Sequence, residues 1–320
     1  MRWMVYGAGA VGGVLRARLH EAGHDVVLVA RGAHLAAIRS QGLTLAAPED
    51  SRTLRVPAVG RAAEVDLAEP TVVLLAVKSH QTHAAVLDLV GAVPPGTPVV
   101  CVQNGVANEP TLLRFFERVY GVCVMMPAGH LEPGVVEQHC SPVPGILDLG
   151  RFPSGVDEVA HDVAAAFCSA GFVSEPRADI MAWKRRKLLM NLANAVQACC
   201  GSGGAATTCG PALSPRARRC WRPRVPVVSE AEDRTRRGDL LQTREVPGGE
   251  RGGGSSWQSL HRGTGTIESD YLNGEVVLLG RLNGVPTPCN ELLRRTALEL
   301  ARAGSPPGSV DAGDLLAQLA

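Results

Sequence analysis

The sequence predicts an α/β protein, with a doubly wound parallel sheet in its first half and an all-α domain in its second half. Three observations support this fold class. Short aliphatic runs alternate with amphipathic stretches from the N-terminus onward, which is typical of parallel βαβ units. The runs are continuously apolar, as expected for strands that are buried on both faces of a sheet. After residue 178 the recognisable patterns are helical.

Four runs in the first half are short, rich in β-branched residues and bounded by turn residues, which predicts strands. These strands are Trp3–Tyr6, Val26–Val29, Val72–Val77 and Pro98–Val102. The stretches between and after them predict helices at Val11–Glu21, His34–Gln41, Gln81–Val90 and Glu109–Val119. The far edge of the same sheet is predicted at Val122–Met126, Gly134–Gln138 and Ile146–Leu149, followed by a helix at Val156–Ser169.

The second half predicts one long helix at Ile180–Ala198, a second at Thr266–Leu282 and a third at Asn290–Ala303. Gly284 and Pro286 mark the stop of the second helix. The domain boundary is expected close to Pro176–Asp179. We therefore expect a nucleotide-binding domain over residues 1–177 and a helical substrate domain over residues 178–320.

The segment Cys199–Pro226 does not fit this pattern. It holds four cysteines, four prolines and five arginines, and it has neither a helical nor a strand period. Two interpretations are open, a long surface loop or a local translation frameshift in a GC-rich gene. Both predict that the segment is poorly packed.

Composition and charge exclude several classes of protein. The chain has 320 residues, of which 45% are hydrophobic, and its 32 basic and 31 acidic residues leave a net charge of +1. This composition is globular, and it lacks the basic surplus that nucleic-acid binding requires. No apolar run approaches the ~18–20 residues that span a bilayer. The nine cysteines include no C-x-x-C pair and no zinc-like spacing, which predicts reduced thiols, a cytoplasmic location and no metal site.

A glycine-rich turn, Gly7–Gly12, directly follows the first predicted strand and opens a helix. Its spacing is G-x-G-x-x-G, which in this context predicts a Rossmann-type dinucleotide site. The three glycines permit the tight turn, the approach of a pyrophosphate and close helix–strand packing. The helix N-terminus offers unpaired N–H groups to the phosphates. The candidate cofactor-binding residues are Gly7, Ala8, Gly9, Ala10, Val11 and Gly12.

The end of the second predicted strand indicates which nucleotide binds. NAD sites usually carry Asp or Glu about 20 residues beyond the glycines. This chain has Ala30 and Arg31 there, and no carboxylate. A guanidinium matches a phosphate in charge and geometry, so the sequence predicts a preference for NADPH.

Two further turns follow the carboxyl ends of predicted strands, where ligands of open α/β sheets bind. Lys78 follows Val72–Val77 and would place a positive charge near the cofactor. Asn104 follows Pro98–Val102, and its amide carries both a donor and an acceptor. Such a group could orient nicotinamide and substrate together.

The long predicted helix carries a polar stripe among leucines. Asn191 and Asn194 lie four and seven residues beyond Lys187, which places all three side chains on one helix face. A lysine facing an apolar cleft can have its pKa lowered and then deliver a proton to a carbonyl oxygen. The neighbouring Lys184, Arg185 and Arg186 are expected to be surface charges.

A second group of polar residues follows near the C-terminus. The hydroxyls of Ser256 and Ser259 could donate to a substrate carboxylate, and Glu268 could accept from a substrate hydroxyl. Taken alone, serines before a helix are usually caps.

Together these pieces resemble the ketopantoate reductases (2-dehydropantoate 2-reductases). The resemblance covers Met1–Ala198 and roughly Val227–Ala303. The matching motifs are GAGAVG (Gly7–Gly12), AVKSHQT (Ala76–Thr82), QNGV (Gln103–Val106), KLLMN (Lys187–Asn191), SSWQS (Ser255–Ser259) and IESDYLNG (Ile267–Gly274).

The resemblance implies NADPH-dependent reduction of 2-dehydropantoate to pantoate, a step of pantothenate biosynthesis toward coenzyme A. It implies Lys187 as proton donor, with Asn191 and Ser256 holding the substrate. Asn104 and Glu268 would contact cofactor and substrate, and Lys78 and Ala128 the cofactor. A homodimer is compatible with it.

The chain departs from the family pattern at two places. The family commonly has a second asparagine eight residues beyond the lysine, where this chain has Ala195, while Asn194 stands at seven. The segment Cys199–Pro226 replaces helical structure. Three alternatives therefore stay open: a reductase of another small 2-oxo acid or imine, a non-catalytic NADPH-binding protein or redox sensor, and nucleic-acid binding through Arg216–Arg224.

Overall fold

The computed structural model describes residues 1–201, 217–220, 225–248 and 252–319. The chain divides into two compact units. Unit 1 contains Met1–Lys184 and Val228–Arg251, and unit 2 contains Arg185–Val227 and Gly252–Ala320. The division falls within helix α6 (Ile180–Asn191). It differs from the single boundary expected after residue 177, because the chain returns to unit 1 after residue 227.

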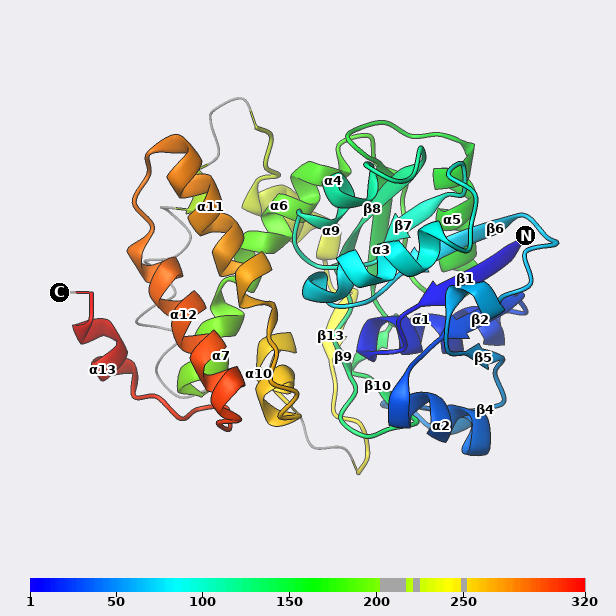
Figure 1. Ribbon diagram of the computed structural model, residues 1–320, viewed down its shortest axis with the longest axis horizontal. Helices are drawn as coiled ribbons and strands as arrows, with labels where there is room; N and C mark the ends of the chain where they lie inside the picture. The colour runs from blue at the N-terminus through cyan, green and yellow to red at the C-terminus, as the bar shows by residue number, and fades with distance from the viewer. Residues whose placement is uncertain (202–216, 221–224, 249–251, 320) are drawn as a thin grey trace. The chain divides into compact units, whose positions relative to one another are not determined.

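A seven-stranded sheet forms the centre of unit 1 (Figure 1). Six strands are parallel, and the edge strand β12 runs antiparallel to β8. In spatial order the strands are β12 (Ile146–Arg151), β8 (Val119–Met125), β7 (Val99–Cys101), β6 (Thr71–Leu75), β1 (Arg2–Tyr6), β2 (Val26–Val29) and β5 (Ala58–Val59). The chain winds outward in both directions from β1. This order confirms the predicted doubly wound sheet and places its topological switch between β1 and β6.

Both faces of this sheet are buried. Trp3 and Val5 of β1 pack in one apolar core, to which helices α1 (Ala10–Glu21) and α5 (Glu158–Ser169) contribute. Met4 and Tyr6 point the other way, into a core that includes residues of α3 (Thr82–Val90) and α4 (Asn108–Leu112). Burial on both faces explains why the strands appear in the sequence as unbroken apolar runs.

One predicted edge strand belongs to a different sheet. We expected Gly134–Gln138 in the main sheet, but β10 (Val135–Gln138) lies in a separate four-stranded sheet. Its order is β4 (Ser51–Leu54), β3 (Leu43–Ala46), β10 and β9 (Ala128–Gly129). β10 pairs parallel with β3, which is distant in sequence. The sheet packs against α1, where a Cβ on Gly13 would lie 2.4 Å from Val136 Cγ1.

The predicted helix Glu109–Val119 is also wrong over most of its length. Helix α4 ends at Leu112, and Val119 already begins β8, whose seven residues are all buried. The remaining elements of unit 1 are α2 (Gly32–Gln41), the 3₁₀ turns η1 (Ala62–Glu64) and η2 (Ser79–Gln81), β11 (Cys140–Pro142), α9 (Glu230–Arg237) and β13 (Leu241–Thr243). The helix α9 and the strand β13 were not predicted from the sequence.

Unit 2 is helical in its described part (Figure 1), which agrees with the predicted all-α second domain. Its elements are the second half of α6, α7 (Ala193–Cys200), α10 (Ser255–His261), the 3₁₀ turn η3 (Glu268–Tyr271), α11 (Asn273–Asn283), α12 (Pro288–Ala303) and α13 (Ala312–Ala317). Gly284 is left-handed (φ +68°) and ends α11, as the sequence predicted. No helix in the described part of the chain is long and apolar enough to cross a membrane.

Two long helices predicted for this unit are each divided. The expected helix Ile180–Ala198 is interrupted at Leu192, between α6 and α7, where Asn273 Nδ2 donates to the Leu192 carbonyl over 3.3 Å. The expected helix Thr266–Leu282 is η3 followed by α11, because Leu272 (φ −110°, ψ −84°) leaves the helical region.

The atypical segment Cys199–Pro226 lies for the most part outside the described residues, and so does the basic stretch Arg216–Arg224. Within the described part, the prediction that the segment is poorly packed is wrong at Ala217 and Cys220, which are fully buried. Cys199 and Cys200 form the end of α7, and the Cys199 side chain is buried among residues of α10 and α12.

Candidate active site

The predicted glycine-rich turn joins β1 to α1 at the carboxyl edge of the sheet. Gly7 has a positive φ of +110°, and a Cβ on it would lie 2.8 Å from Val77 Cγ1. A Cβ on Gly12 would lie 1.9 Å from the Gly7 carbonyl oxygen. In contrast, a Cβ on Gly9 would have no atom of the described residues within 4 Å. The turn is therefore closed on its protein side and open at Gly9, as a pyrophosphate site requires.

The first turn of α1 presents backbone N–H groups without a side-chain cap. Gly9 is the N-cap residue, it provides no side-chain cap, and no acidic residue lies in the first turn. The first N–H groups of a helix have no partner within the helix and carry a partial positive charge. Ala10, Val11 and Gly12 therefore fit a dinucleotide phosphate group.

Arg31 lies at the carboxyl end of β2, as the N-cap residue of α2. It is exposed, and its Nη2 donates to the Tyr6 hydroxyl over 2.6 Å. The Tyr6 hydroxyl in turn donates to Asp88 Oδ2 over 2.8 Å. Burial, together with this bond to Asp88, raises the pKa of Tyr6 to about 12. Tyr6 therefore stays neutral, and its hydroxyl donates to Asp88 while it accepts from Arg31, directly before the glycine-rich turn.

The two other predicted turns are held together by amide side chains. Gln103 Nε2 donates to the Val77 carbonyl over 2.8 Å, next to Lys78. Asn108 Nδ2 donates to the Asn104 carbonyl and to Ser79 Oγ, each over 3.2 Å. These bonds join the turn after β6 to the turn after β7. β6 borders the topological switch, and β7 is the next strand in the sheet.

Asn104 carries a buried polar atom that is not used by this network. Its Oδ1 has no hydrogen-bond partner among the residues that the structure describes. A buried acceptor without a partner is costly, so it favours a ligand that donates to it. Ala128 lies in β9, a strand of the small sheet that packs against α1.

Lys184 is not the surface charge that the sequence predicted. Its side chain is 2% exposed, and its Nζ lies 2.8 Å from Glu109 Oε1, which is itself fully buried. The same Nζ donates to the carbonyls of Gln103 (2.7 Å) and Val122 (3.0 Å). Arg186, also expected at the surface, is 8% exposed. Lys184 therefore holds the backbone of the Gln103–Asn104 turn.

In unit 2, α6 carries Lys187 and Asn191 one turn apart. Lys187 is half-buried, and Asn191 is 5% exposed. Asn191 Nδ2 is buried and finds no acceptor in the described part of the chain. A buried amide donor beside a lysine fits the carboxylate or carbonyl oxygen of a substrate.

Asn194 and the two serines come from neighbouring helices of the same unit. Gly254, the N-cap residue of α10, donates to Gln197 Oε1 over 2.8 Å, and a Cβ on it would lie 3.2 Å from Asn194 Oδ1. The start of α10 therefore lies against α7. Ser256 and Ser259 of α10 are both buried, and Ser259 Oγ donates to the Ser255 carbonyl within the helix.

Glu268 begins η3 and is 5% exposed. Burial lowers the pKa of Arg262, and the nearby charge of Glu268 opposes this shift. Asn273, five residues further on, lies in the IESDYLNG motif, although no role was predicted for it. It is 1% exposed, and it bonds both the Leu192 carbonyl and Asn290 Oδ1 (3.1 Å). It thereby fixes the backbone directly after Asn191.

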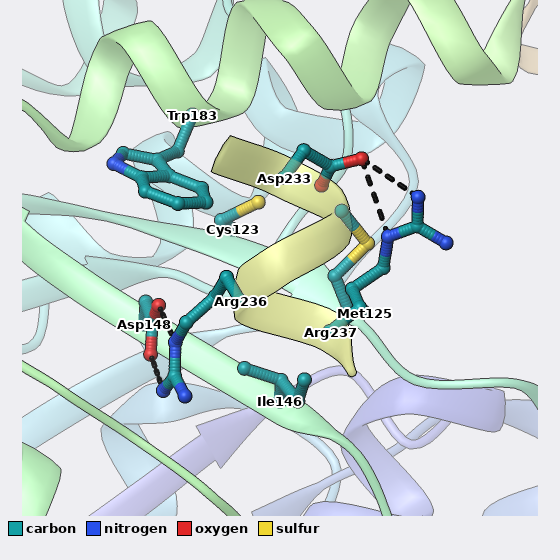
Figure 2. Close-up of a pocket in the computed structure, with 8 residues that line it drawn as sticks. All are labelled: Cys123, Met125, Ile146, Asp148, Trp183, Asp233, Arg236 and Arg237. Carbon is teal, nitrogen blue, oxygen red and sulfur yellow. Dashed lines mark hydrogen bonds and ion pairs between the residues drawn. The ribbon is translucent and has the colours of Figure 1, made fainter. Parts of the chain in front are cut away.

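The cavity shown in Figure 2 is structural. It lies in unit 1 and has room for about one water molecule (10 Å³), which excludes a nucleotide or substrate. Asp148 accepts from Arg236 over 2.7 and 2.8 Å and from Arg177 over 2.6 Å. Arg177 also lies 4.3 Å from the centre of the Trp183 ring. These contacts anchor α9 and the start of α6 to β12.

His34 of α2 lies against the glycine-rich turn. Its Nε2 is 2.8 Å from the Ala8 carbonyl oxygen, and the Gly134 N–H donates to its Nδ1 over 2.8 Å. Its ring lies 4.2 Å from the His130 ring, centre to centre. Burial, and to a smaller extent His130, lowers the pKa of His34 to about 4.

This pKa predicts a pH dependence of stability. Unfolded histidine titrates near pH 6.5, so between pH 6.5 and 4 the unfolded chain binds a proton that the folded chain does not. The free energy of unfolding should therefore fall by on the order of 2 kcal/mol as the pH drops through this range, and the penalty saturates below pH 4. Urea unfolding at pH 7 and pH 4.5 measures it. His34→Gln should show a smaller fall than the wild type; equal falls would contradict the assignment.

The parallel sheet and the glycine-rich turn after its first strand define a protein with a Rossmann-type fold. The family model "Ketopantoate reductase PanE/ApbA" matches residues 3–154, and "Ketopantoate reductase PanE/ApbA C terminal" matches residues 179–300. The chain belongs to the ketopantoate reductase family.

Curated relatives and solved structures agree with this membership. A 2-dehydropantoate 2-reductase of Mesorhizobium japonicum is 31% identical over 333 residues (93% of this chain, 98% of the relative). That of Pyrococcus horikoshii is 29% identical over 304 residues (92% and 95%). The crystal structure of a PanE/ApbA family ketopantoate reductase from Ralstonia eutropha is 28% identical with a TM-score of 0.79 (95% and 99%). A D-mandelate dehydrogenase solved with NADH and anilino(oxo)acetate has a TM-score of 0.80 at 21% identity (95% and 99%), which shows a common fold.

Proposed function

We propose that this chain reduces 2-dehydropantoate to pantoate with NADPH, and that Lys187 is the proton donor. The observation that carries the proposal is the geometry of the turn at Gly7–Gly12. Gly7 and Gly12 pack closely against protein atoms, and Gly9 leaves room for a ligand among the described residues. The family membership supports the substrate, because the curated relatives that match nearly the whole chain are 2-dehydropantoate 2-reductases.

The reaction needs a hydride at the carbonyl carbon and a proton at the carbonyl oxygen. The reduced nicotinamide supplies the hydride when the nucleotide is bound. Lys187, as an ammonium, gives the proton to the oxygen and is reprotonated from solvent. The products are the 2-hydroxy acid and the oxidised nucleotide, so electrons and protons balance.

The remaining residues bind and orient. Gly7–Gly12 would hold the pyrophosphate, Arg31 the 2′-phosphate, and Lys78, Ala128 and Asn104 the rest of the nucleotide. Asn191, whose buried Nδ2 has no acceptor among the described residues, would donate to the substrate. Asn194, Ser256 and Ser259 would complete the substrate site, and Glu268 would accept from the substrate hydroxyl.

Oxidation of NADPH followed at 340 nm with 2-dehydropantoate tests the activity, and fluorescence titration of NADPH measures binding separately. Turnover with 2-dehydropantoate supports the proposal. Tight NADPH binding without turnover on any 2-oxo acid would instead favour the non-catalytic nucleotide-binding alternative. If neither is observed, the proposal fails.

A second candidate is reduction of another 2-oxo acid on the same scaffold. It is favoured by Asn194, which stands seven rather than eight residues beyond Lys187 on a helix that is interrupted at Leu192. A panel of 2-oxo acids that differ in the group at C3, including benzoylformate, separates the two candidates. A kcat/KM for 2-dehydropantoate below that of another member of the panel would favour the second.

Arg31 predicts the nucleotide preference. We expect Arg31→Ala to raise the Kd for NADPH about 10–100-fold, because a charge-assisted bond to phosphate contributes about 1.5–3 kcal/mol. The Kd for NADH should change less than about threefold, since NADH lacks the 2′-phosphate. Fluorescence titrations of both nucleotides measure the ratio. An equal loss for both, or none for either, would contradict the role of Arg31.

A further inference from the structure

His34 is fixed from three directions, although it takes no part in the proposed chemistry. The Gly134 N–H can only donate, so His34 Nδ1 must accept from it. The proton of the neutral ring is therefore on Nε2, which donates to the Ala8 carbonyl. The His130 ring packs beside it, and His130 Nδ1 lies 2.9 Å from the Val135 carbonyl oxygen.

This bond determines the orientation of one peptide unit in the glycine-rich turn. In a planar trans peptide the C=O and the N–H point in opposite directions. Because the Ala8 carbonyl points to His34, the Gly9 N–H points away from α2. No acceptor for this N–H is found among the described residues. The Gly9 N–H therefore belongs with the first-turn donors of α1.

The turn needs such a constraint. Its donors are backbone groups, and the glycines that allow the close approach of a ligand also allow other conformations. Gly9 provides no side-chain cap, and no atom of the residues that the structure describes would lie within 4 Å of a Cβ on it. Preorganised donors bind an anion better than donors that must first be ordered.

We propose that His34 is a positioning residue for the pyrophosphate site, and that it aligns the Ala8–Gly9 peptide through its Nε2–H bond to Ala8. The inference rests on the proposed nucleotide-binding function. Arg31 and His34, both at the start of α2, would then have different roles. Arg31 would bind the 2′-phosphate, which only NADPH carries, and His34 would order the pyrophosphate site, which NADPH and NADH share. The lowered pKa of His34 keeps the required tautomer neutral at physiological pH.

Fluorescence titrations of NADPH and NADH with matched variants test whether His34 contributes to the binding of both nucleotides. His34→Leu removes both hydrogen bonds, and we expect it to raise the Kd of both nucleotides by the same factor, about five- to tenfold. His34→Gln can still donate to Ala8 and accept from Gly134, so it should stay within about twofold of the wild type. His130→Leu removes the ring contact but keeps both His34 bonds, and it should bind as the wild type does.

Kinetics give a readout that a purely structural role would not produce. His34→Leu should raise KM for the nucleotide while kcat at saturating NADPH stays within about twofold. If His34→Leu fails to fold, His34→Asn is expected to show the same loss, because its shorter side chain cannot bridge Ala8 and Gly134.

Three results would overturn the inference: unchanged Kd values in a folded His34→Leu, a His34→Gln variant as weak as His34→Leu, or a loss confined to NADPH. These results are distinct from a failure of the proposed function. That failure would appear in the wild type, as no binding of either nucleotide.

Discussion

Lys187→Ala is expected to lower kcat for 2-dehydropantoate by about 10²–10⁴-fold, the usual contribution of a positioned general acid. The reason is that hydride addition turns the carbonyl oxygen into an unstable alkoxide unless a general acid protonates it. Lys187 is half-buried on α6, one turn before the buried Asn191. The Kd for NADPH should change less than about twofold, because the residues assigned to the nucleotide phosphates belong to the β1–α1 turn and α2.

Lys187→Arg provides the matched control. It retains a positive charge and a long side chain, but a guanidinium does not release its proton at accessible pH. If Lys187 acts by proton transfer, the arginine variant is almost as inactive as alanine. If Lys187 only attracts the substrate carboxylate, the arginine variant recovers most of the activity, with the change mainly in KM. Stopped-flow single turnovers at saturating NADPH separate these results.

The fold was predictable where a pattern is local. The strand Val26–Val29 and the turn at Gly7–Gly12 are recognisable because their signals, a continuous apolar run and a fixed glycine spacing, lie within a few residues. The strand β10 was predicted, but in the wrong sheet, because it pairs in parallel with β3, about 90 residues away. β3 itself was not predicted, although its other partner, β4, follows it directly in the sequence. Asn273, which donates to the Leu192 carbonyl at the junction of α6 and α7, lies 81 residues further along the chain.

The candidate active site was likewise predictable only where the signal is local in the sequence. The sequence placed Lys187, Asn191 and Asn104 by motif spacing, but it predicted Lys184 as a surface charge within the run KRRK. A basic run is usually solvated, and the lysine has no acidic neighbour in sequence. Its partner Glu109 is 75 residues away, near the start of α4. Only the tertiary structure shows that this pair is buried.

The buried pair Lys184–Glu109 therefore carries the second large expected effect, this time on stability. Lys184→Met would leave the Glu109 carboxylate fully buried without its cation, and removing one partner of a buried pair costs about 3–5 kcal/mol. Lys184 Nζ also satisfies the Gln103 and Val122 carbonyls, so the variant should bind NADPH more weakly as the Gln103–Asn104 turn loosens. Urea unfolding measures the first effect and fluorescence titration the second.

The double variant Lys184→Met/Glu109→Leu separates two effects of Lys184. One is the cost in stability of an unpaired buried charge, and the other is the ordering of the Gln103–Asn104 turn. Replacing both partners by apolar residues removes the unpaired charge, so most of the lost stability should return. The carbonyl of Gln103 stays without its donor, however, so NADPH binding should remain as weak as in Lys184→Met. If the double variant is as unstable as the single one, the cost arises from packing and not from charge. If the double variant recovers both stability and binding, the Lys184 bond to Gln103 does not order the turn.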